Sequence, residues 1–225
     1  MLDLDLRKQE RKNSGLPDFL HKRTYNLIIG LCILYGFVLN ALIVWALGPF
    51  FQRVNYFVLI IGYVICCIIG VVITRSNKPI MSFLGYNLVV IPIGAVVSVI
   101  LPAFYITDIL LAIITTGVVV LLMTVLSSFY PLFFAKLGRV LFFSLLISLI
   151  VQLVTLFFGY AGNLFNWIFV VIFSLYIGYD WYKAQVYPKT LDNAIDSALD
   201  LYLDIINLFL RLLQIFASSR NRRTN

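Results

Sequence analysis

The aspartates near the end of this chain are the residues whose type and spacing can do chemistry. The 225-residue sequence has only ten acidic residues, and half of them lie within 25 positions: Asp180, Asp192, Asp196, Asp200 and Asp204. The last four repeat every four residues, so on a helix they share one face. At about 100° per residue, that face continues through Asp200, Asp204, Asn207, Arg211 and Gln214.

A polar stripe on an apolar helix has two interpretations. The helix either directs its polar face into a membrane bundle or lies flat in the headgroup plane. The residues beside this stripe are strongly apolar, and its charge is mixed rather than rich in lysine, so a membrane-spanning helix is favoured.

Asp204 and Asp180 are the acidic residues expected inside the membrane. Asp192 and Asp196 fall in the first turns, near water, whereas an ionised Asp204 inside the membrane costs about 2.5–3.5 kcal/mol unless it is paired or wetted. Asp180 ends the preceding apolar run, and helices joined by a short loop can pack antiparallel, which allows Asp180 and Asp204 to meet. Such a pair would share a proton, making it a candidate pH sensor and an oxygen-ligand site for a hard cation such as calcium. Arg75 either supplies a counter-charge or extends to the membrane surface.

The apolar blocks that position these residues predict an all-α, polytopic membrane protein. The chain is 62% hydrophobic and 12% charged, and its apolar residues form blocks of about 20, the length that crosses a bilayer. Seven transmembrane helices are expected, at residues 24–47, 55–74, 79–101, 107–126, 139–158, 163–181 and 194–216.

The chain is thereby divided into three parts: a polar N-terminal tail (1–23), a transmembrane domain (24–217) and a basic C-terminal tail (218–225). Six of the seventeen Lys and Arg residues lie in the first tail, and the loops expected on the same side are also basic. This distribution predicts a cytoplasmic N-terminus. Three arginines in the C-terminal tail would then lie outside, unless the last segment is re-entrant and returns.

Other functions find little support in the residue pattern. The net charge of +7 reflects membrane anchoring rather than nucleic-acid binding. Cys32, Cys66 and Cys67 lie in apolar runs without disulfide or zinc spacing, and the single histidine, His21, lies in the tail. Without an HExxH motif or a nucleophile elbow, we expect neither an enzyme nor a bound cofactor.

Two segments, residues 173–180 (FSLYIGYD) and 198–210 (ALDLYLDIINLFL), carry a resemblance to the Bax inhibitor-1 (transmembrane BAX inhibitor motif) family. The similarity is strongest over the last fifth of the chain, the seven-span hydropathy is similar throughout, and Thr74-Arg75 is a further landmark. The resemblance implies a bundle around a central last helix and, as in bacterial members, a pH-sensitive calcium leak. It implies that Asp180 and Asp204 share a proton, with an arginine resembling Arg75 contacting the first aspartate. Residues 181–185 and Asp200 depart from the common pattern.

The sequence therefore predicts a calcium or other cation leak channel gated by protonation of Asp180 and Asp204, with Arg75 assisting and Asp200, Asn207 and Arg211 forming a secondary polar stripe. Its expected partners are the lipid bilayer, calcium ions and protons, in a bacterial plasma membrane. Two alternatives stay open: a proton-coupled secondary cation transporter, and a non-catalytic membrane regulator acting through unknown protein partners.

Overall fold

Seven long helices make up the protein in this computed structural model, which describes residues 19–157 and 163–224. In chain order the elements are α2 (Lys22–Phe51), α3 (Tyr56–Thr74), α4 (Pro79–Ile100), the 3-10 helix η1 (Leu101–Ala103), α5 (Ile106–Phe129), α6 (Pro131–Phe157), α7 (Asn163–Val186) and α8 (Leu191–Thr224). The described residues contain no strand. Each of the seven α-helices is long and apolar enough to cross a bilayer, so the prediction of an all-α, multi-pass integral membrane protein is confirmed.

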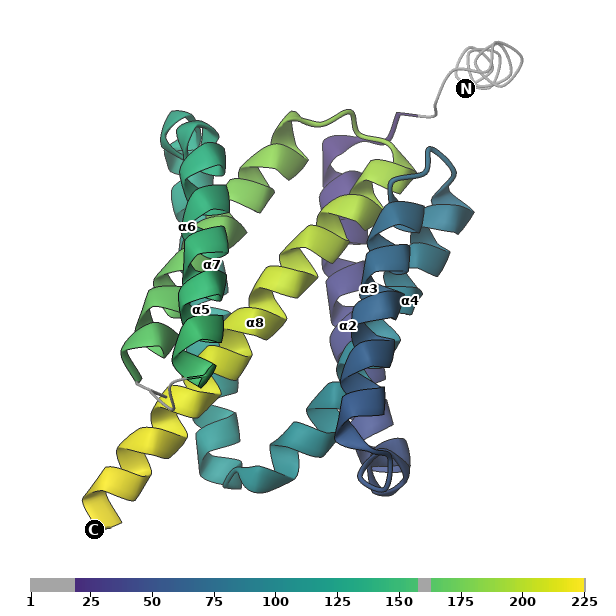
Figure 1. The fold of residues 1–225 in the computed structure, drawn as a ribbon. Helices are drawn as coiled ribbons and strands as arrows, with labels where there is room; N and C mark the ends of the chain where they lie inside the picture. The colour runs from purple at the N-terminus through teal and green to yellow at the C-terminus, as the bar shows by residue number, and fades with distance from the viewer. Residues whose placement is uncertain (1–18, 158–162, 225) are drawn as a thin grey trace, which may run out of the picture.

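Helix α8 occupies the centre of the bundle. It runs obliquely between a group formed by α2, α3 and α4 and a group formed by α5, α6 and α7 (Figure 1). It packs against α2 and α4 on one side and against α5 and α7 on the other. Of its most apolar stretch 56% is buried inside the protein, against at most 22% for α2, α3, α5 and α6. The central last helix implied by the family resemblance is therefore present.

Small residues allow the closest helix contact in the first group. A Cβ atom added to Gly70 of α3 would lie 2.8 Å from the carbonyl oxygen of Gly85 on α4, and one added to Gly85 would lie 2.5 Å from the backbone nitrogen of Thr74. In lipid, helices gain stability from such close packing, because burial of apolar surface no longer drives their association.

Two helices extend well beyond the spans predicted from the sequence. Helix α6 begins at Pro131 rather than near residue 139, because proline at the first helical position loses no hydrogen bond. Helix α8 extends to Thr224 instead of ending near residue 216, so most of the predicted C-terminal tail is helical. Residues 1–18 of the expected N-terminal tail, and the end of the expected fifth span at residue 158, lie outside the described residues.

The length and continuity of α8 favour a crossing over a re-entrant last segment. Its 34 residues rise about 51 Å, which exceeds the roughly 30 Å of hydrocarbon. The helix is continuous from the end of the bundle that carries His21 and the α7–α8 connection, here called the N-terminal end, to the opposite, C-terminal end (Figure 1). The last segment is therefore one continuous helix that is long enough to cross the bilayer, and its described residues do not turn back.

Candidate functional site

The two deepest aspartates meet at the interface of α7 and α8. The short connection between these helices makes them antiparallel neighbours, and the fully buried Ala184, Ala194 and Ala198 permit close packing where they converge. Asp180 and Asp204 are only 6% and 7% exposed, and their carboxyl groups are within hydrogen-bonding contact of one another.

The environment of Asp204 makes the Asp180 carboxyl its principal polar neighbour. Its Oδ2 atom is buried and accepts no hydrogen bond from an N–H or O–H group of the described residues. A carboxylate has no donor of its own, so a hydrogen bond between two carboxyl groups requires a proton on one of them. The geometry expected from the sequence, in which these two side chains come together, is thus present.

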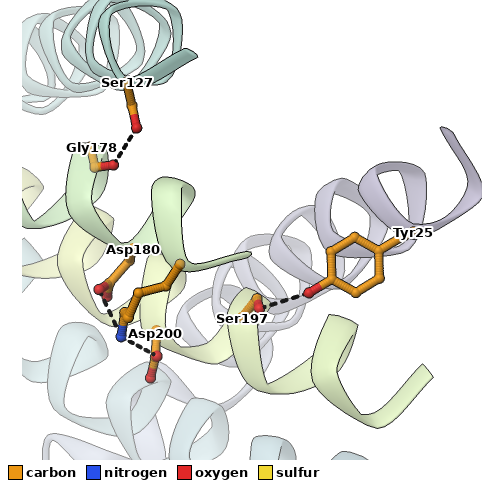
Figure 2. Close-up of polar contacts among 7 residues, drawn as sticks. Tyr25, Ser127, Gly178, Asp180, Ser197 and Asp200 are labelled. Carbon is orange, nitrogen blue, oxygen red and sulfur yellow. Dashed lines mark hydrogen bonds and ion pairs between the residues drawn. The ribbon is translucent and has the colours of Figure 1, made fainter. Parts of the chain in front are cut away.

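The cation beside this pair is Lys183, a residue that sequence reasoning missed. Its Nζ atom lies 2.9 Å from Oδ1 of Asp180 and 3.0 Å from Oδ2 of Asp200. Figure 2 shows Asp180 of α7 and Asp200 of α8, each joined by a dashed line to the ammonium group that lies between them. The available signal was the three-residue interval between Asp180 and Lys183, which places both on one helix face.

Among the described ion pairs, Arg75 does not form the contact with Asp180 that the resemblance implied. It caps the C-terminus of α3 and is exposed, and its charge acts on Asp196 in the first turns of α8. The reason is topological: α3 packs mainly on α4, whereas Asp180 lies on α7 in the other helix group. The described ion pairs connect Asp180 to Lys183 instead.

The remaining residues of the polar stripe lie further along α8. The Asn207 side chain donates a hydrogen bond to the carbonyl of Leu203, one turn earlier in the same helix. The Arg211 guanidinium donates to Oδ1 of Asn166 on α7 at 3.2 Å and lies 4.1 Å from the centre of the Phe169 ring. Arg211 therefore places a positive charge in the α7–α8 interface, nearer the C-terminal end than the aspartate pair.

Hydrogen bonds from other helices hold the α7–α8 unit in place near the site (Figure 2). Ser127 of α5 donates to the carbonyl oxygen of Gly178 at 2.6 Å, two residues before Asp180. Tyr25 of α2 and Ser197 of α8 share a hydrogen bond of 3.1 Å. These bonds are worth about 1 kcal/mol each, and they fix both helices that carry the carboxyl groups.

No preformed metal cage accompanies the pair. Within residues 19–157 and 163–224, no three histidine, cysteine, aspartate or glutamate side chains are gathered as metal ligands. A calcium ion normally takes six to eight oxygen ligands. The described residues around the pair therefore offer fewer grouped carboxylates than a calcium site normally uses.

A second ion pair fastens α8 at the C-terminal end. The Nη2 and Nε atoms of Arg220 lie 2.7 and 3.2 Å from Oδ1 of Asp108, in the first turn of α5. Arg220 also hydrogen-bonds to Thr107 and stacks on the ring of Tyr105 at 4.9 Å. One of the three tail arginines is thereby neutralised, which removes part of the charge conflict noted in the sequence.

The fold and the site together define a multi-pass membrane protein with a carboxyl pair buried against its central helix. The family profile described as "Inhibitor of apoptosis-promoting Bax1" matches residues 16–221. The chain therefore belongs to the Bax inhibitor-1 family, as the resemblance predicted.

Individual relatives come from bacteria and plants. Protein YrjE of Lactococcus lactis is 27% identical over 95% of this chain and 96% of its own length. Protein LIFEGUARD 4 of Arabidopsis thaliana is 37% identical over 49% of this chain and 47% of its own. A Helicobacter pylori protein is 34% identical over 40% of this chain, which spans only about two fifths (39%) of that relative's length.

Proposed function

We propose that this protein is a passive cation pathway, with calcium as the permeant ion, whose conductance changes with the protonation of Asp180 and Asp204. The observation that carries the proposal is the contact between two buried carboxyl groups on the central helix and its antiparallel neighbour. The Bax inhibitor-1 family, to which the chain belongs, is generally linked to calcium leak or cation transport.

The carboxyl pair suits this role because its charge changes with the number of bound protons. With one shared proton, the two groups hold each other and keep α7 and α8 together. Loss of that proton leaves two negative charges in contact, which repel one another and attract a hard divalent cation. The charged or titratable groups around the pair are Tyr176, Lys183 and Asp200, so the pH response belongs to this cluster as a whole.

The orientation follows from the charges at the two ends of the bundle. The N-terminal end carries Lys22 and Arg23 of α2, Arg75 and Lys78 between α3 and α4, and Lys189 between α7 and α8. Between its helices, the C-terminal end carries only Arg53 among the described basic residues. Cytoplasmic loops of membrane proteins carry an excess of lysine and arginine. We therefore propose that the N-terminal end faces the cytoplasm of a bacterial cell.

Calcium flux in proteoliposomes tests the proposal. The purified full chain is reconstituted, and calcium uptake down its gradient is followed between pH 5 and pH 8 for the wild type, Asp180→Asn and Asp204→Asn. The wild type is expected to show pH-dependent uptake that both variants lose, because an amide cannot release the proton. Asp192→Asn, an acid in the first turn of α8 away from the pair, is the matched control and should retain the pH response.

Other outcomes separate the alternatives. A pH response that is identical in wild type and both variants would rule out the carboxyl pair as the sensor. Uphill calcium movement driven by a proton gradient would indicate a secondary transporter. Rescue of a deletion strain by a variant without flux would indicate a regulator that acts through protein partners.

A further inference from the structure

The Lys183 ammonium occupies a position between carboxylates that a mobile cation would also favour. It lies 2.9 Å from Asp180 on its own helix and 3.0 Å from Asp200 on α8, and the ring centre of Tyr179 lies 5.2 Å away. Asp200 precedes Asp204 by one helical turn, so the ammonium contacts the side of the carboxyl pair that faces the N-terminal end.

The exposed fraction of these side chains falls from Asp200 towards the carboxyl pair. The Asp200 side chain is 46% exposed, that of Lys183 is 23% exposed and that of Asp180 is 7% exposed. Beyond them, Oδ2 of Asp204 is buried and accepts no hydrogen bond from an N–H or O–H group of the described residues. A cation moving from Asp200 towards Asp180 therefore encounters the Lys183 ammonium between these two carboxyl groups.

Charge balance makes the ammonium an exchangeable occupant. When ionised, Asp180 and Asp200 carry two negative charges against the single positive charge of Lys183. A divalent cation neutralises both, and carboxylate oxygens are the ligands that calcium prefers. Lysine is a compact charge on a flexible four-carbon stem, so it can leave the carboxylates without movement of the helix backbone.

We propose that Lys183 is a tethered competitor of divalent cations, whose ammonium holds the Asp180 carboxylate until a calcium ion displaces it. This inference rests on the proposed cation pathway and adds the residue that sets how much calcium is needed to occupy it. Lys183 acts by occupying the site and is not itself a ligand.

Equilibrium calcium binding tests the competition without requiring transport. Binding of radioactive calcium to the full chain in lipid nanodiscs is measured for the wild type, Lys183→Gln and Lys183→Arg. Removing the positive charge should lower the calcium concentration at half-saturation by about ten-fold or more. A unit charge about 4 Å from a partly buried carboxylate interacts strongly with it and so competes with calcium for that carboxylate. Lys183→Arg keeps the charge and should stay near the wild type.

Lys189→Gln is the matched control, because Lys189 lies six residues later and donates its hydrogen bonds to the backbone carbonyls of Ala184, Gln185 and Tyr187. Its calcium half-saturation should match the wild type. Equal half-saturation in Lys183→Gln and the wild type would overturn the inference.

The wild-type protein provides a second readout that does not depend on a variant folding. Calcium that displaces the ammonium should leave Lys183 more open to an amine-acetylating reagent, and peptide mass spectrometry should find faster modification of Lys183 but not of Lys189. Calcium-independent acetylation of Lys183 would also overturn the inference.

The two proposals fail in different ways. If calcium flux depends on Asp180 and Asp204 but Lys183→Gln binds calcium as the wild type does, the competitor role of Lys183 is refuted and the cation pathway stands. Tighter binding in Lys183→Gln, with no flux in any protein, would refute the pathway and leave the competition at Asp180 standing.

Discussion

Replacing Arg220 with glutamine tests whether the end of α8 is held by its ion pair with Asp108. The Asp108 side chain is 4% exposed and that of Arg220 is 36% exposed, so the pair lies between a buried and a surface salt bridge. Loss of one partner costs about 3–5 kcal/mol for a buried pair, whereas an exposed pair contributes about 0–1 kcal/mol. We expect an intermediate loss of about 2 kcal/mol, or about 30-fold in the local opening equilibrium.

Hydrogen exchange of the last turns of α8 measures this loss directly. The full chain in nanodiscs is compared with Arg220→Gln, and the amides of residues 216–220 should exchange about 30-fold faster in the variant, because local opening no longer breaks the pair. Ser219→Ala is the matched control, since Ser219 bonds only to the carbonyl of Ile215 in its own helix among the described contacts. Equal exchange in Arg220→Gln and wild type would refute the assignment of Asp108 as an anchor for α8.

Three further predictions concern contacts around the site, and thermal unfolding in detergent measures each. In Gly178→Ala the new Cβ would clash with a ring carbon of Phe134, so the unfolding temperature should fall by the equivalent of about 1–3 kcal/mol. An unchanged unfolding temperature would show that the ring moves aside freely. Ser127→Ala removes the 2.6 Å bond to the Gly178 carbonyl and should cost about 1 kcal/mol, with a less than additive effect in the double variant. Partial burial and the nearby Lys22 lower the pKa of Lys189 from its ordinary value of 10.5. Just below pH 10.5, Lys189 therefore binds more protons in the unfolded chain than in the folded protein. The stability of the wild type should rise with pH in this interval, and the stability of Lys189→Gln should rise less. Equal slopes of stability against pH in the two proteins would contradict this prediction.

The all-helical membrane fold and the contact between Asp180 and Asp204 could be predicted from the sequence, because both follow from local patterns. Blocks of about 20 apolar residues require membrane crossing, and a short loop between two such blocks makes antiparallel neighbours. Asp180 and Asp204 then lie on helices that must touch, and the cost of an isolated charge in lipid favours their contact.

The partner of Asp180 could not be predicted in the same way. Arg75 and Lys183 both lie at helix ends near the N-terminal end of the bundle, and choosing between them requires knowing that α3 packs on α4 while α7 lies in the other helix group. The position of the Lys183 ammonium further depends on four rotatable bonds of its side chain and on Asp200 of the neighbouring helix. The pattern of apolar residues contains neither piece of information.

The central position of α8 has a consequence for how the protein is made. The six helices that α8 joins precede it in the chain, so both helix groups leave the ribosome before the helix that fills the space between them. Until then Asp180 has neither Asp200 nor Asp204 beside it, and Tyr25 lacks Ser197. Before α8 is added, these polar groups of α2 and α7 therefore lack their α8 partners, and addition of α8 brings the two carboxyl groups together.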